Sequence, residues 1–141
     1  MIAVGKLKER GLRDLVDEYY ARVRRHVACE EVELRDGRDV AAALRAAIPD
    51  RAQVIALEVD GVQMTSEGLA ERLVQWGSRG NGVVAFVIGG ADGIPAEVSD
   101  RAHVRWSLSK LTLAHRVARV VLAEQIYRAI SIWRSEPYHR A

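Results

Sequence analysis

Three glycines directly after an apolar run are the feature of this sequence that most suggests ligand binding. Residues 83–88 are all apolar and lead into Gly89-Gly90-Ala91-Asp92-Gly93. Glycine lets the backbone approach a ligand closely and leaves room for N–H groups to donate to it. The loop lacks the G-x-G-x-x-G order of a dinucleotide fold, and no Gly-Lys-Ser/Thr follows it. Taken alone, it indicates either a ligand-binding turn or a tight turn that needs positive φ.

Two further segments are expected beside this loop. Residues 57–61 follow a predicted strand at 54–57, and residues 107–115 follow another at 104–107. In open α/β sheets the carboxyl ends of parallel strands lie at one edge, where ligands bind. We therefore expect all three segments to line one pocket, although Asp60-Gly61 by itself is only an ordinary turn signal.

The elements that position these segments alternate between strands and helices. Strands are predicted at 27–34, 54–57, 83–88 and 104–107 after a short apolar opening at 1–4, and the six apolar residues of 83–88 indicate a central strand. Helices are predicted at 12–26, from a cap at Asp39 to a stop before Pro49, at 69–76 capped by Thr65 or Ser66, with Pro95 in the first turn of a short helix, and at 115–133. This order predicts an α/β fold, a mainly parallel sheet with helices on both faces.

The last predicted helix is apolar around most of its circumference. Its apolar residues cover far more than the roughly 100° stripe of a surface helix. This surplus suggests a helix packed between two subunits, most simply in a symmetric dimer. Within it, Glu124 and Arg128 have the i, i+4 spacing of a simple ion pair.

Composition limits the class of protein. With 141 residues, 49% hydrophobic and 28% charged, the chain is expected to form one domain over residues 1–141. The single Cys29 has only His26 nearby, so neither a disulfide nor a metal site is expected. No apolar run reaches the roughly 18 residues of a membrane span, and the first ten residues do not resemble a signal peptide, so we expect a cytoplasmic protein without membrane contact.

Charge is concentrated near the end of the chain. Residues 101–141 contain eight basic and two acidic side chains, although the net charge of the whole chain is only +2. A basic surface of this kind suits a phosphate-rich partner such as a nucleic acid, and it is equally compatible with a solvated face.

Four ordered segments resemble the ribosomal RNA large subunit methyltransferase H family, which is of the SPOUT class. They are residues 86–93, 106–115, 119–129 and 137–140, and the similarity extends over essentially the whole chain. The resemblance implies a trefoil-knotted fold, a homodimer and S-adenosyl-L-methionine as the methyl donor. It implies as acceptor N3 of a pseudouridine in helix 69 of 23S rRNA, in the large subunit or the assembled ribosome.

The resemblance also assigns residues. Those implied to contact the cofactor are Leu57, Gly89, Gly90, Leu108, Ser109, Lys110, Leu111, Thr112, Leu113 and Ala114, the last at a position where the family usually has proline. The terminal motif of Tyr138, His139 and Arg140 is expected to reach across the dimer to the base and the donor. His139 is the first candidate for removing the N3 proton and His115 the second. Arg119, Arg128 and Arg140 are expected to hold phosphates or the deprotonated base.

Two other classes remain open from the sequence. A non-catalytic RNA-binding dimer would account for the basic end and the apolar last helix. A nucleotide-binding metabolic enzyme could use the same glycine loop.

Overall fold

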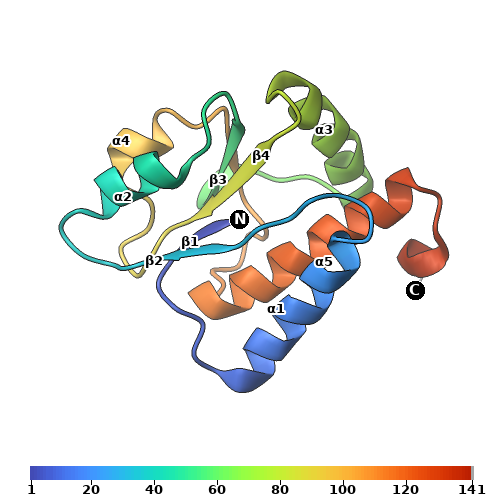
Figure 1. The fold of residues 1–141 in the computed structure, drawn as a ribbon, viewed down its shortest axis with the longest axis horizontal. Helices are drawn as coiled ribbons and strands as arrows, with labels where there is room; N and C mark the ends of the chain where they lie inside the picture. Colours follow the sequence, from blue (N-terminus) through green and yellow to red (C-terminus); the bar gives the residue numbers. More distant parts are fainter. Residues whose placement is uncertain (141) are drawn as a thin grey trace.

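The computed structural model describes residues 1–140, which form a five-stranded parallel sheet covered by helices (Figure 1). The strands are β1 (Ile2–Val4), β2 (Val32–Leu34), β3 (Gln53–Val62), β4 (Val84–Ile88) and β5 (Val104–Trp106), in the order β2-β1-β4-β3-β5. The helices are α1 (Arg10–Val23), α2 (Val40–Ala47), α3 (Ser66–Arg79), α4 (Ala96–Ser99) and α5 (His115–Trp133), followed by the 3₁₀ turn η1 (Pro137–Arg140). All strand pairs are parallel, so every carboxyl end lies at the same edge.

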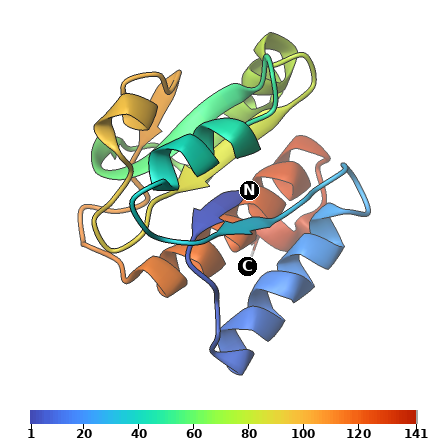
Figure 2. The same cartoon turned by 60° about the vertical axis from the view of Figure 1, so that its left-hand side comes forward.

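Helices cover both faces of the sheet, as Figure 2 shows from the side. One face packs against α2 and α4 through a core that includes Val54, Val87, Leu44 and Val98. The other face packs against α3 and α5, and α1 lies on α5 through a smaller core around Val16, Tyr20 and Ala123. The predicted α/β class and the parallel sheet with two covered faces are confirmed; the trefoil knot implied by the resemblance stays a prediction.

Several predicted elements agree closely with the structure. The helix at 115–133 has the predicted bounds, and β4 is the third of five strands and therefore central. Thr65 caps α3, because its Oγ1 accepts a hydrogen bond from the Gly68 N–H at 3.0 Å.

Other boundaries were wrong for identifiable reasons. The strand predicted at 27–34 contains only Val32–Leu34, because its partner β1 offers three residues to pair with and the chain at 26–27 is still closing the turn after α1. Strand β3 continues past Leu57, since Val62 also pairs with Trp106 beyond a bulge. Asp39 precedes α2 without a side-chain cap, and Pro95 lies just before the first helical residue of α4 instead of inside its first turn.

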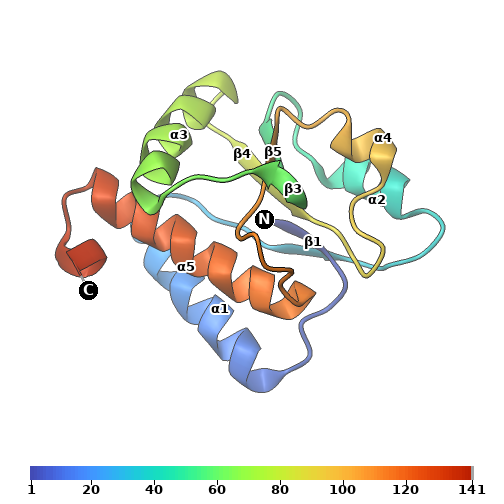
Figure 3. The same ribbon diagram turned by 180° about the vertical axis from the view of Figure 1, so that it is seen from behind.

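Helix α5 is covered mainly by its own chain. Its buried residues Leu122, Ala123, Ile126, Ala129 and Ile130 pack into the cores shared with the sheet, α1 and α3. Figure 3 shows α5 from behind, with α1 and α3 beside it. The apolar surplus of this helix therefore does not by itself require a second subunit. Its remaining exposed apolar side chains are Val117 and Trp133, at opposite ends.

No helix in residues 1–140 is long and apolar enough to cross a membrane. Over the same residues, no group of three or more His, Cys, Asp or Glu side chains is placed to hold a metal ion.

Candidate active site

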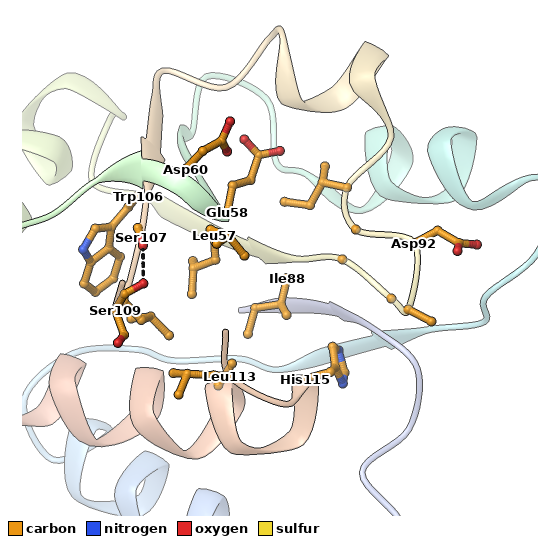
Figure 4. A pocket seen from close by; sticks show the side chains of 18 of the residues that line it. Leu57, Glu58, Asp60, Ile88, Asp92, Trp106, Ser107, Ser109, Leu113 and His115 are labelled. Atoms are coloured by element: carbon orange, nitrogen blue, oxygen red, sulfur yellow. Dashed lines mark hydrogen bonds between the residues drawn. The ribbon is translucent and has the colours of Figure 1, made fainter. Parts of the chain in front are cut away.

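A row of three side chains at the carboxyl ends of neighbouring strands forms one wall of a pocket. In the sheet register Leu57 pairs with Ile88 of β4 on one side and with Trp106 of β5 on the other. All three line a hollow of about 530 Å³. Figure 4 shows Leu57, Ile88 and Leu113 around a common space. The predicted gathering of the three strand-end segments at one edge is confirmed.

The glycine loop is both a tight turn and part of this pocket. A Cβ on Gly89 would lie 2.2 Å from the carbonyl carbon of Gly93, so only glycine allows this approach of backbone to backbone. Gly93 has φ +80°, and its N–H donates to the Gly90 carbonyl at 3.1 Å. Residues 88–94 all line the pocket. The two interpretations of this loop are therefore compatible.

The loop after β5 is shaped by two serines. The Ser107 hydroxyl donates to the Ser109 carbonyl at 2.8 Å, and the Ser109 hydroxyl accepts from the Leu111 N–H at 2.9 Å. Leu108, Ser109, Leu111 and Leu113 line the pocket. Three other residues with a predicted cofactor contact are exposed and lie outside the lining, namely Lys110, Thr112 and Ala114.

The charged residues of the pocket lining are all carboxylates. Glu58, Asp60 and Asp92 line it, whereas no lysine or arginine of residues 1–140 does. Arg105 forms an ion pair with Glu58 and approaches the two carboxylate oxygens of Asp60 at 3.1 and 3.2 Å. The single positive charge of Arg105 therefore faces two carboxylates, Glu58 and Asp60, and Asp92 adds a third negative charge to the lining. The balance is negative, which suits a ligand with positive charge.

His115 is the titratable ring of the pocket. It begins α5 and is half-buried, and its Nε2 is buried without a hydrogen-bond partner in residues 1–140. Burial and then the Arg119 charge lower the pKa of His115, while Asp36 and Glu33 oppose the shift. The imidazole is therefore neutral at neutral pH and can accept or donate one hydrogen bond.

Arg119 has an internal role, which corrects its assignment to RNA contact. Its side chain is fully buried, and Nη2 lies 2.5 Å from both Glu31 Oε1 and Glu33 Oε1. Nη1 donates to the Gly5 carbonyl at 3.2 Å, and Arg13 contacts the same two glutamates. A guanidinium without exposed surface cannot reach a phosphate, so we assign Arg119 to joining α5, β2 and the segment after β1.

The terminal motif is placed away from the pocket of its own chain. Tyr138 is held at Glu124, nine residues after His115, which is about 14 Å along the axis of α5. None of residues 137–140 lines the pocket, and Figure 3 shows the C-terminal segment at the far end of α5. His139 Nδ1 is buried without a partner in the described part of the chain, and Arg140 is exposed.

Arg128 forms the ion pair that its spacing predicts. Its Nε and Nη2 donate to Glu124 Oε1 at 3.0 and 2.7 Å. The pair is partly buried, which leaves little of the guanidinium for a phosphate.

Sequence reasoning missed several residues of the pocket lining. Glu58, Asp92, Ile88, Trp106 and Ala118 lie within or beside predicted segments, but no individual role was given to them. The signal that could have found Ile88 and Trp106 is their place at the ends of parallel strands. Glu58, Asp60 and Asp92 could have been noticed because they are the charged residues of segments 57–61 and 89–93.

Comparison with known proteins agrees with this architecture. The family model described as "Predicted SPOUT methyltransferase" matches residues 1–139. A protein named ribosomal RNA large subunit methyltransferase H from Sorangium cellulosum is 53% identical over 137 residues, which are 96% of this chain and 94% of that protein. Proteins of the same name from Bifidobacterium animalis subsp. lactis and Anaeromyxobacter dehalogenans are 41% and 42% identical over 99% of this chain and 98% and 97% of their own lengths. The chain therefore belongs to the SPOUT methyltransferase family.

Proposed function

We propose that this protein transfers a methyl group from S-adenosyl-L-methionine to N3 of a pseudouridine in helix 69 of 23S rRNA. The observation that carries the proposal is the pocket at the ends of β3, β4 and β5, which is built from the segments that resemble the family. The names of the relatives support a ribosomal RNA substrate. Action on ribosomal RNA would place the protein in the cytoplasm.

The residues of the pocket fit this cofactor. Leu57, Ile88, Leu108 and Leu113 offer apolar walls for an adenine ring, and the loop backbones offer N–H and C=O groups for its edge. The carboxylates of Glu58, Asp60 and Asp92 suit a ligand that carries a sulfonium and an ammonium group. When bound, S-adenosyl-L-methionine supplies an activated electrophilic methyl group.

The protein's own contribution is to place the acceptor and to remove its proton. Good alignment of reacting groups is worth about 7 to 11 kcal/mol. The imide N3 carries a proton, and a positioned base accelerates its removal by roughly 10² to 10⁴. We assign this role to His139, with neutral His115 as the alternative, and we assign Arg140 to stabilising the deprotonated base.

A homodimer would bring the terminal motif to the pocket. Residues 137–140 do not line the pocket of their own chain, so a second copy is needed to supply them. Exposed apolar side chains of the pocket lining support such contact: Val59 and Leu111 are 62% and 74% exposed. We propose that each pocket receives residues 137–140 of the partner chain, which we call the tail.

The test is a methylation assay with 50S and 70S particles, with the product located by primer extension. His139→Ala should lower the single-turnover rate while cofactor affinity stays unchanged. Equal loss of both would assign His139 to cofactor binding instead.

Mixing variants tests the shared site. At a cofactor concentration too low to fill the Gly89→Ala pocket, a His139→Ala chain and a Gly89→Ala chain should each lose most of their activity. Exchange of subunits should restore about a quarter of the sites, because half of the dimers then have one complete site. Ribosomal RNA binding without cofactor binding would support a non-catalytic dimer. Calorimetry that shows preference for NAD or ATP over S-adenosylhomocysteine would support a metabolic enzyme.

A further inference from the structure

The chain folds back on itself directly after α5. Ser135 has φ +58°, a left-handed conformation that ends helices. Its N–H donates to the Ile132 carbonyl at 3.0 Å, and the Glu136 N–H donates to the Ser131 carbonyl at 2.8 Å. This reversal lays Tyr138 of η1 against the side of α5 and α1, on the same chain.

Four side chains receive Tyr138, and we call them the tyrosine socket: Tyr19 of α1 and Glu124, Tyr127 and Arg128 of α5. The Tyr138 hydroxyl donates to Glu124 Oε1 at 3.0 Å and lies 3.3 Å from the Tyr19 hydroxyl. The Tyr138 ring centroid is 4.7 Å from that of Tyr127, and the Arg128 guanidinium carbon is 4.9 Å from it. The ring and the hydroxyl are thus held at the same time.

The socket is rigid because its parts hold one another. Glu124, Tyr127 and Arg128 have the i, i+3, i+4 spacing of one helix face. Glu124 Oε1 accepts from both Arg128 and Tyr138, so one carboxylate oxygen fixes the arginine and the incoming phenol. Tyr138 therefore attaches the tail to two packed helices, in addition to Glu136, whose Oε2 lies 3.7 Å from His26 Nε2 and whose Oε1 accepts from Arg134 Nε at 3.0 Å.

The contacts of Tyr138 are those of an anchor. Burial and the hydrogen bonds with Tyr19 and Glu124 raise the pKa of Tyr138, so the phenol keeps its proton at neutral pH. That proton is already donated to Glu124. The next two residues, His139 and Arg140, have no hydrogen-bonded side-chain partner in the described chain, and they are the groups with unused hydrogen-bonding capacity.

We propose that Tyr138 is a positioning residue, whose insertion into the tyrosine socket of its own chain sets His139 and Arg140 in the place from which they act at the pocket of a second copy. This inference rests on the proposed function. Because the tail is already held in place, less conformational entropy is lost when it is positioned for the reaction, and the barrier is lower. It also assigns Arg128, together with its partner Glu124, to the socket, whereas the resemblance implied RNA contact for Arg128.

The kinetic test compares Tyr138→Phe with Tyr138→Ala on the ribosomal particle that the wild-type chain methylates. Phenylalanine keeps the ring contacts and loses one hydroxyl, so kcat should fall by no more than about tenfold. Alanine removes the anchor and should lower kcat by about 10²-fold, with KM for S-adenosyl-L-methionine unchanged. If the phenol itself moved a proton, the Phe variant would lose about 10² to 10⁴ and its pH profile would change. That result, or an Ala variant as active as wild type, overturns the proposal.

Glu124→Leu tests the socket from the other side, because leucine has no oxygen to accept the Tyr138 hydroxyl. It should lower kcat less than Tyr138→Ala, and the double variant with Tyr138→Phe should be no worse than the lower single variant, because both changes remove the same hydrogen bond between Glu124 and Tyr138. Additive losses would overturn the shared role of Glu124 and Tyr138.

A measurement without catalysis separates this proposal from the proposed function. Hydrogen exchange of the amides of residues 135–140 in the full chain should accelerate in Tyr138→Ala and remain slow in Tyr138→Phe. Unchanged exchange in Tyr138→Ala would overturn the docking itself. If the wild-type chain methylates no ribosomal particle while exchange accelerates as expected, the proposed substrate fails and the docking is supported.

Discussion

The two ends of α5 carry the two halves of the proposed site, and they are built by different means. At its start, the pocket is shaped mainly by backbone, through a glycine turn and three strand ends in register, with two serine hydroxyls in the loop after β5. At its other end, backbone hydrogen bonds of Ser135 and Glu136 turn the chain, and side chains then hold Tyr138 in the tyrosine socket. Backbone geometry tolerates changes of exposed side chains but not of glycine, whereas the tail depends on particular functional groups.

The largest expected effect is on the buried charges behind the pocket. Arg119→Met leaves Glu31 and Glu33 without their main partner and should destabilise the protein by about 3 to 5 kcal/mol. Urea unfolding measures this loss. Arg10→Met, at a side chain 95% exposed, is the control and should change stability very little. A small effect of Arg119→Met would mean that the network does not hold α5 in place.

The second-largest effect is expected at the glycine turn of the pocket. Gly89→Ala puts a Cβ against the backbone of Gly93 and Ile94 at 2.2 to 2.5 Å, so the loop must move. We expect cofactor affinity to fall by at least about tenfold, which equals about 1.4 kcal/mol. Calorimetry with S-adenosylhomocysteine measures it. Gly11→Ala, in α1 with nothing near its Cβ, should bind normally, and normal binding by Gly89→Ala would contradict the role of the turn.

Lowering the pH should reduce the stability of the fold through His115, at the start of α5, before the contribution of Glu33 is affected. The pKa of His115 is lowered by burial and by Arg119, so the unfolded chain binds the proton more strongly. The contribution of neutral His115 to the free energy of unfolding is complete above the ordinary imidazole pKa of about 6.5. It is lost as the pH falls from there through the lower pKa that His115 has in the folded chain. The slope cannot exceed about 1.4 kcal/mol per pH unit for one proton.

Unfolding measured between pH 7.5 and 5 checks this, with His115→Gln as the comparison. The variant should lose less stability over that range. Glu33 does not interfere there, since burial raises its pKa but the Leu7 N–H and Arg119 lower it more, and its contribution is lost only below the ordinary carboxyl range. Equal slopes for wild type and variant would show that His115 is not the group responsible.

The smallest effect is expected at Ala114, in the loop that leads from the pocket into α5. Ala114 has φ −58°, close to the value that proline imposes, and it lies immediately before α5. Ala114→Pro should stabilise the protein by about 0.4 to 1 kcal/mol by restricting the unfolded chain. Thermal unfolding measures the gain. A loss of stability would show that the Ala114 N–H or the conformation of Leu113 matters to the loop.

Much of the pocket was predictable from local pattern. The apolar run before Gly89 predicted a central strand, and strand ends predicted the edge at which Leu57, Gly90 and Leu113 meet. These inferences succeed because strand burial and glycine turns are local properties of the chain. The resemblance to a family added the identity of the candidate cofactor and acceptor, which no local pattern contains.

Other features could not be predicted in this way. Arg119 and Arg140 are the same residue type in the same basic stretch, yet one is buried among glutamates from β2 and its approach, and the other is exposed. The partners of Arg119 are 86 and 88 residues away in sequence, so its burial depends on packing between distant segments. The apolar surplus of α5 suggested a second subunit for the same reason, because the sequence does not show how α1 and α3 cover it.

The sequence by itself determined the order of strands and helices, the glycine turn and the membership of a family, since each depends on neighbouring residues or on whole-chain similarity. Only the tertiary structure decided which charges are buried, which carboxylates line the pocket and that Tyr138 is held by its own chain. The physical reason is that burial and pairing are set by contacts between residues far apart along the chain, and these contacts exist only after the sheet and its helices have packed.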